Sequence, residues 1–182
     1  MKEIKTNSTY SSTHQKRFNH TLKFIKKLDL NGNSILDLVP VNPFSEVLRN
    51  NGFKVTNTGK TQDLDLDFDI VKSSDFDIIT AFEIFEHMVS PFPLLKSINA
   101  NQLIASVPLR LWFSAAYWNN NDSYDCHYHE FEPRQFDLLL KKAGWEIIQS
   151  EKWKAPTKLN GIRPLLRKFT NRYYIVYAKR KH

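Results

Sequence analysis

The stretch FDIITAFEIFEHM, residues 76–88, decides the fold. Its first part, through Phe82, is short and almost continuously apolar, which is typical of a strand buried on both faces of a parallel sheet. Two carboxylates and an imidazole follow the strand, at Glu83, Glu86 and His87. Because ligands of open α/β sheets bind outside the carboxyl ends of the strands, these side chains are predicted to border a binding site.

Strand-like and helix-like segments alternate on both sides of this stretch. Helix starts are marked by Asn42-Pro43, Ser90-Pro91 and Pro133, where a capping residue precedes the helix or proline takes its first position. The alternation predicts a doubly wound, Rossmann-like α/β sheet of seven strands, in which the last strand runs antiparallel. The predicted strands cover residues 34–38, 53–58, 64–68, 75–82, 102–107, 145–153 and 172–179.

The length of 182 residues fits a single domain over residues 1–182, with residues 1–30 as a helical lead-in. The single cysteine, Cys126, excludes an intramolecular disulfide framework and a cysteine-rich metal module. No apolar stretch approaches the roughly 20 residues of a membrane span, and residues 1–13 lack the apolar core of a signal peptide. The sequence therefore predicts a cytoplasmic protein.

The net charge of +7 is unevenly distributed along the chain. Residues 1–30 carry seven Lys and Arg against two acids, and residues 152–182 carry ten against none. Residues 154–171 are predicted to leave the sheet as a basic excursion between the last two strands. These basic ends fit an anionic acceptor or a nucleic acid backbone, but solvated basic faces are the simpler interpretation, and no RNA-binding motif accompanies them.

Four segments together resemble the class I S-adenosylmethionine-dependent methyltransferases, in particular small bacterial members with a Glu-His pair after the fourth strand. The segments are residues 35–38, 76–88, 103–108 and 127–145. The resemblance implies the methyltransferase fold. It also implies an enzyme that transfers a methyl group from S-adenosylmethionine to an oxygen or nitrogen atom of a small-molecule or glycan-type acceptor.

The same resemblance implies which residues hold the cofactor. Val39, Val41 and Pro43 stand where family members place glycines that let the backbone approach it. Asn57 stands where the family has an acid for the ribose hydroxyls, and an acid near Asp65 or Asp67 stands where the family often bonds the adenine amine. The departures predict a weakened S-adenosylmethionine site, and they leave open a catalytically inactive binding module. The implied cofactor-binding residues are Asp37, Val39, Val41, Asn57, Asp65, Phe82 and Glu83.

A hydroxyl acceptor needs a base that titrates near neutral pH, and the two candidates are His87 and His127. Packing of His87 against the following helix is an equally good interpretation. Residues 125–130 hold five metal-ligating side chains in six positions. Alternate side chains of an extended segment point to opposite faces, so we expect no metal site there.

Residues 109–132 form a long loop that is rich in aromatic side chains, which we call the aromatic loop. Connections of this length without secondary structure are often functional. The rings could stack on a planar or sugar-containing acceptor, or they could form a small satellite core over the sheet. The aromatic residues in question are Trp112, Phe113, Tyr117, Trp118, Tyr124 and Tyr128.

Overall fold

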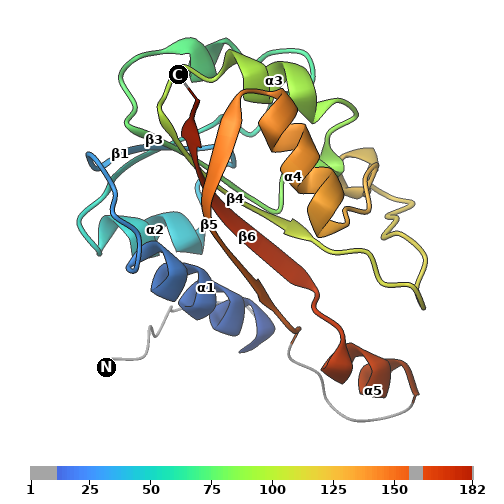
Figure 1. The fold of residues 1–182 in the computed structure, drawn as a ribbon. Coiled ribbons are helices and arrows are strands. Elements are labelled where there is room, and N and C mark those ends of the chain that lie inside the picture. Colours follow the sequence, from blue (N-terminus) through green and yellow to red (C-terminus); the bar gives the residue numbers. More distant parts are fainter. Residues whose placement is uncertain (1–11, 156–161, 182) are drawn as a thin grey trace.

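The computed structural model describes residues 12–155 and 162–181, and its strands form one sheet in the order β2-β1-β3-β4-β6-β5 (Figure 1). Neighbours from β2 through β4 pair in parallel, whereas β6 runs antiparallel to both β4 and β5. This confirms the doubly wound α/β sheet with an antiparallel last strand. The strands are β1 (Ser34–Asp37), β2 (Lys54–Asn57), β3 (Ile78–Phe82), β4 (Gln102–Pro108), β5 (Trp145–Trp153) and β6 (Tyr173–Arg180).

Helices cover both faces of the sheet, with α1 and α2 on one face and α3 and α4 on the other (Figure 1). Successive strand residues divide between two apolar clusters, as the alternation of side chains along a strand requires. Ile35 and Ile78 join the cluster under α1 and α2, while Leu36 and Ile79 join the opposite one. The helices are α1 (Ser12–Ile25), α2 (Pro43–Arg49), α3 (Pro91–Ser97), α4 (Pro133–Lys142) and α5 (Ile162–Phe169).

The strand predicted over residues 64–68 is wrong, so the described part of the chain has six strands rather than seven. Residues 64–66 form a turn, and a 3-10 helix, η1 (Asp69–Lys72), follows. The Asp63 carboxylate accepts a hydrogen bond from the backbone N–H of Asp65 at 2.9 Å, and its carbonyl accepts one from Asp67 at 2.7 Å. Short acidic side chains compete with sheet pairing in this way, which explains the error.

The aromatic loop contains one short 3-10 helix, η3 (Ser123–Asp125), and a single bridge between Leu109 and Phe131. Five of its rings are exposed, so they do not form a satellite core. The exposed rings are Trp112, Tyr117, Trp118, Tyr124 and Tyr128.

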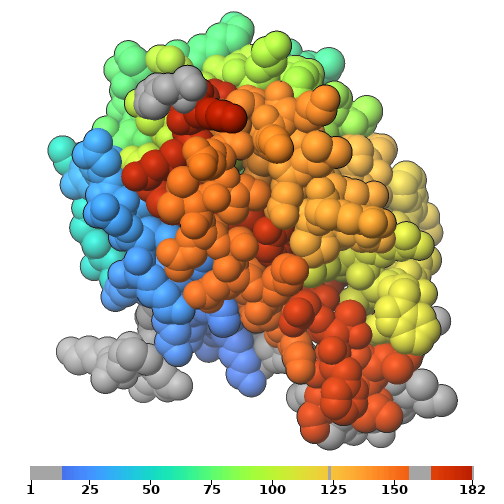
Figure 2. Space-filling view, viewed as in Figure 1, coloured from blue at the N-terminus to red at the C-terminus, as the bar shows by residue number. Residues whose placement is uncertain are grey.

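The predicted basic excursion contains α5, which lies at the periphery of the molecule (Figures 1 and 2). The part of the excursion at residues 156–161 lies outside the described residues, as do residues 1–11 of the lead-in. Among the described helices, none has the length and apolarity needed to cross a membrane.

Candidate functional site

A cavity of about 300 Å³ opens at the carboxyl ends of β1, β3 and β4. Asp37, Glu83 and Ser106 reach it from these three strand ends, and Arg17 reaches it from α1. A second cavity of about 390 Å³ adjoins it, because Ile84 and His87 line both. The first cavity lies where the order of strands reverses, between β1 and β3, which is the usual ligand position in this architecture.

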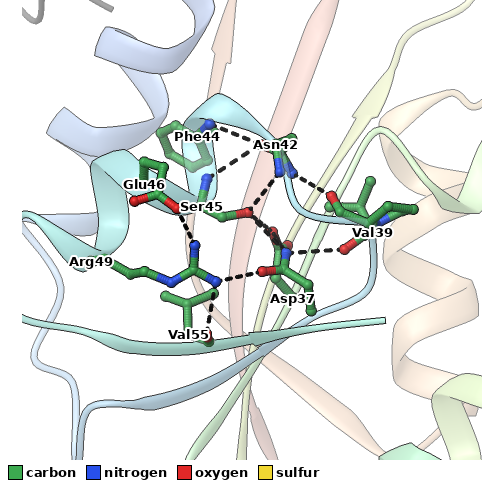
Figure 3. Close-up of polar contacts among 10 residues, drawn as sticks. Asp37, Val39, Asn42, Phe44, Ser45, Glu46, Arg49 and Val55 are labelled. Carbon is green, nitrogen blue, oxygen red and sulfur yellow. Dashed lines mark hydrogen bonds and ion pairs between the residues drawn. The ribbon is translucent and has the colours of Figure 1, made fainter. Parts of the chain in front are cut away.

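Asp37 is the most deeply buried acid of the first cavity, with 1% of its surface exposed. Its carboxylate accepts hydrogen bonds from Thr80 Oγ1 at 2.8 Å, from Ser45 Oγ at 3.3 Å and from Asn57 Nδ2 at 3.3 Å. Burial raises the pKa of Asp37 to about 6, although the hydrogen bonds from Thr80 and Ser45 oppose the shift. The residue therefore anchors the end of β1 to β3 through Thr80 and to α2 and β2 through Ser45 and Asn57. Figure 3 shows its contacts within the turn.

The turn after β1 is held by side chains rather than by glycine. Asn57 Nδ2 donates to the carbonyl of Val39 at 3.0 Å and to Ser45 Oγ at 2.8 Å, and Asn57 Oδ1 accepts from Arg49 at 2.8 Å (Figure 3). Asn42 caps α2 by accepting from two backbone N–H groups, as the sequence predicted. Asn57 is thus occupied within the turn and does not line the first cavity.

The two valines of this turn lie in different surroundings. Val39 forms part of the wall of the first cavity, whereas Val41 is 66% exposed and lines neither cavity. The substitutions at the expected glycine positions therefore leave the cavity open. Phe82 also lines it, and its ring meets Phe44 edge to face at 5.3 Å.

Glu83 occupies a strained backbone position, with φ of 58° in the left-handed region that non-glycine residues rarely adopt. Ser106 Oγ donates to its Oε1 at 2.9 Å, and Arg17 Nη1 lies 3.7 Å from its Oε2. Burial raises the pKa of Glu83, while the nearby charge of Arg17 opposes the shift. The carboxylate of Glu83 and the guanidinium of Arg17 therefore lie side by side in the wall of the first cavity.

The two candidate bases lie next to each other, with ring centroids 4.9 Å apart. His87 lines both cavities, and burial lowers its pKa, followed by the charge of His127. His127 is packed behind it and lines neither cavity. Burial raises the pKa of the adjoining Glu86 well above its ordinary value, with the charge of Glu83 adding to the shift.

Asp65 lies in the wall of the second cavity, with Tyr124 and Tyr128 from the aromatic loop. Its two oxygens accept hydrogen bonds from the backbone N–H groups of Val89 and Ser90, each at 2.8 Å. The carboxylate therefore connects the turn after β2 to the start of α3.

Sequence reasoning missed the contribution of α1 to the site. Arg17, Phe18 and Thr21 line the first cavity from this helix, together with Phe44 of α2. Phe18 stacks on Phe44 with centroids 5.1 Å apart, which holds α1 over the end of β1. No local signal marks these residues, because their role depends on how the helix packs across the sheet.

Comparison with known families gives one match, in which the model of a methyltransferase domain covers residues 12–150. The chain belongs to this methyltransferase domain family. The predicted class I S-adenosylmethionine-dependent methyltransferase is thereby confirmed at the level of the family, together with its fold. The matched range of this methyltransferase domain includes every predicted site residue. A comparison with curated proteins finds no match.

Solved structures resemble the methyltransferase domain over almost its whole length. An S-adenosylmethionine-dependent methyltransferase from Mesorhizobium loti is 14% identical with a TM-score of 0.63, covering 93% of this chain and 99% of its own. Magnesium protoporphyrin IX methyltransferase from Synechocystis, solved with S-adenosylhomocysteine, is 14% identical with a TM-score of 0.61, covering 97% and 90%. The 1,6-didemethyltoxoflavin-N1-methyltransferase from Burkholderia thailandensis is 15% identical with a TM-score of 0.56, covering 97% and 94%. At such identities the likeness concerns the fold.

Proposed function

We propose that this methyltransferase domain transfers a methyl group from S-adenosylmethionine to an oxygen or nitrogen atom of a small-molecule or glycan-type acceptor. The observation that carries the proposal is the open first cavity at the end of β1, whose wall includes Asp37, Glu83 and Arg17. With the adjoining second cavity it reaches the size range of ligand pockets, about 300 to 1,000 Å³. Val39 and Val41 do not fill it.

The charged groups of the first cavity fit the amino-acid end of the cofactor. A methionine moiety carries a carboxylate and an ammonium group, and Arg17 and Glu83 offer the complementary charges side by side. The guanidinium of Arg17 would thus take over anion binding that the turn after β1 performs poorly, since Pro40 and Pro43 lack N–H donors.

We place the nucleoside end of the cofactor in the second cavity. Ile84 forms an apolar wall common to both cavities, against which a flat base can pack. Beyond it, Asp63 and Asp65 line the second cavity and can accept hydrogen bonds from an exocyclic amino group. This assignment gives Asp65 the role that the sequence predicted and leaves Asn57 as a support of the turn.

His87 stands at the junction of the two cavities and is the proposed base. When bound, S-adenosylmethionine supplies a methyl group on a sulfonium sulfur, which leaves as a neutral thioether with the electron pair of the broken bond. The acceptor atom forms the new bond to the methyl carbon and releases a proton. The Nδ1 of His87 lies 3.1 Å from the Cys126 carbonyl and must donate to it, so Nε2 is free to take the proton.

Calorimetric titration with S-adenosylhomocysteine tests the cofactor assignment without knowledge of the acceptor. We expect binding at micromolar to sub-millimolar concentration, and Arg17→Gln should weaken it by about 10- to 150-fold, since a charged hydrogen bond contributes about 1.5–3 kcal/mol. Val39→Gly should tighten binding because it removes a side chain from the cavity wall, while Val41→Gly, at an exposed position, is the matched control.

Absence of heat or thermal stabilisation at millimolar cofactor would contradict the proposal and favour a binding module that keeps only the fold. An equal effect of Val39→Gly and Val41→Gly would contradict the placement of the cofactor. Turnover on any acceptor would in turn exclude the binding module.

A further inference from the structure

Three metal-ligating side chains converge behind the junction of the two cavities. Glu86, His87 and His127 each contribute one ligand atom, and these atoms all lie within 4.8 Å of one another. The first two belong to the 3-10 helix η2 (Phe85–His87), and the third comes from the aromatic loop. The backbone carbonyl of Glu86 accepts hydrogen bonds from the N–H groups of Tyr128 at 2.8 Å and His129 at 3.2 Å, which holds the loop against η2.

The Glu86 carboxylate is buried without full hydrogen bonding. Its side chain is 1% exposed, and its Oε2 has no hydrogen-bond partner among the described residues. Its Oε1 lies 3.8 Å from the Nε2 of His87. A buried carboxylate oxygen without a partner is strongly unfavourable, and native structures seldom retain one unless a ligand, an ion or a water completes it.

Both imidazoles are oriented by hydrogen bonds from their Nδ1 atoms. The Nδ1 of His87 donates to the carbonyl of Cys126, and the Nδ1 of His127 lies 3.1 Å from the carboxylate of Glu130. Neither a carbonyl nor a carboxylate can donate, so Nε2 of each neutral ring keeps its lone pair. Histidines that bind metals are oriented in this manner by a carbonyl or carboxylate on the opposite nitrogen.

The geometry points to a divalent transition-metal site formed by Glu86, His87 and His127, for which Zn²⁺ is the reference cation. Two imidazoles and one carboxylate match the three protein ligands of open zinc sites, and imidazole favours such cations over Mg²⁺ or Ca²⁺. Bonds of about 2.1 Å in a tetrahedron would bring the ligand atoms about 3.4 Å apart, so the side chains need to close by about 1 Å.

His87 lines both cavities, so a cation bound to it would lie beside them. There the cation would hold an oxygen atom of the acceptor and favour release of its proton to solvent water, because His87 would then be a metal ligand and not a free base. That role rests on the proposed function, whereas cation binding itself does not require cofactor or acceptor. The two ideas can therefore fail separately.

Metal binding is best measured on untagged protein treated with chelator, by calorimetry with Zn²⁺ and by visible absorption with Co²⁺. We expect a single cation per chain and no competition from millimolar Mg²⁺. Glu86→Gln and His127→Gln should each weaken binding at least roughly tenfold, and Glu130→Gln, which alters only the orientation of a ligand, should do so by about 10- to 100-fold.

His129→Gln is the matched control, because His129 lies on the same loop but its Nε2 contacts the carbonyl of Val89. Circular dichroism checks that each variant folds. Because Glu86 and His127 lie on separate segments, the test still stands if one of these two variants fails to fold. The inference is overturned if the wild-type protein takes up neither Zn²⁺ nor Co²⁺, or if His129→Gln weakens binding as much as His127→Gln. S-adenosylhomocysteine binding with no cation uptake would remove the metal site alone.

Discussion

Replacement of Asp37 by Asn should change how the stability of the protein depends on pH. Burial raises the pKa of Asp37 from 3.8 to about 6 in the folded chain. Because one pKa unit corresponds to about 1.4 kcal/mol, the shift corresponds to about 3 kcal/mol. The folded state binds this proton more tightly than the unfolded state. The stabilisation is therefore complete below about pH 4 and is lost as the pH rises through about 6.

Urea unfolding of the wild-type and Asp37→Asn proteins between pH 4 and pH 7 isolates this contribution. Asparagine has no proton to release, so the unfolding free energy of the variant minus that of the wild type should rise by about 2.4 kcal/mol from pH 4 to pH 7. Altered hydrogen bonds to Thr80, Ser45 or Asn57 change the unfolding free energy of the variant by the same amount at every pH. They therefore do not affect how the difference between the two proteins changes with pH.

Asp77→Asn provides the control of opposite sign. Hydrogen bonds from Ser34 lower the pKa of Asp77, so this carboxylate stabilises the folded state above its unfolded pKa and ceases to do so as the pH falls. The unfolding free energy of this variant minus that of the wild type should rise as the pH falls below about 4, so this pair is measured down to about pH 3. A difference between Asp37→Asn and wild type that stays constant from pH 4 to pH 7 would refute the reasoning.

Two further pairs of substitutions, each a test with its control, probe packing and the aromatic loop. Gly32→Ala should lower the unfolding free energy by more than about 2 kcal/mol, because φ is 86° and an added Cβ would lie 2.2 Å from the Cγ of Asp77. Gly52→Ala, at φ of 95° with nothing within 4 Å, should lose only about 1 kcal/mol in the same denaturation assay. Tyr124→Ala should raise the KM for S-adenosylmethionine, because Tyr124 lines the second cavity, and it should change stability by less than about 0.5 kcal/mol. Trp112→Ala, which lines neither cavity, should leave this KM unchanged.

The parts of the fold that local chemistry specifies could be predicted from the sequence. The helix starts at Asn42-Pro43 and Pro133 are where capping rules place them, and the apolar run before Glu83 is the buried strand β3. The error at residues 64–68 arose where alternating acids imitate a strand while bonding to their own backbone.

The sites that depend on long-range packing could not be predicted in this way. Arg17 reaches the first cavity because α1 crosses the end of β1. His127 lies close to Glu86 and His87. Its loop is held there by backbone hydrogen bonds to the carbonyl of Glu86, which stands about forty residues earlier in the sequence. The expectation of no metal site considered only neighbours along the chain and did not weigh Glu86 and His87, which lie on η2.

The Asn57 side chain reaches from β2 into the turn after β1. It thereby links positions 39 and 57, which sequence comparisons usually treat as independent. An aspartate at position 57 would set its charge against Asp37, while a glycine at position 39 would loosen the peptide whose carbonyl the amide now holds. Exchange at either position alone should therefore lower the stability of this turn, even though Val39→Gly favours cofactor binding, and the pair should covary. Homologues of this chain should carry Val39 with Asn57, or glycine with an acid, and seldom a mixture.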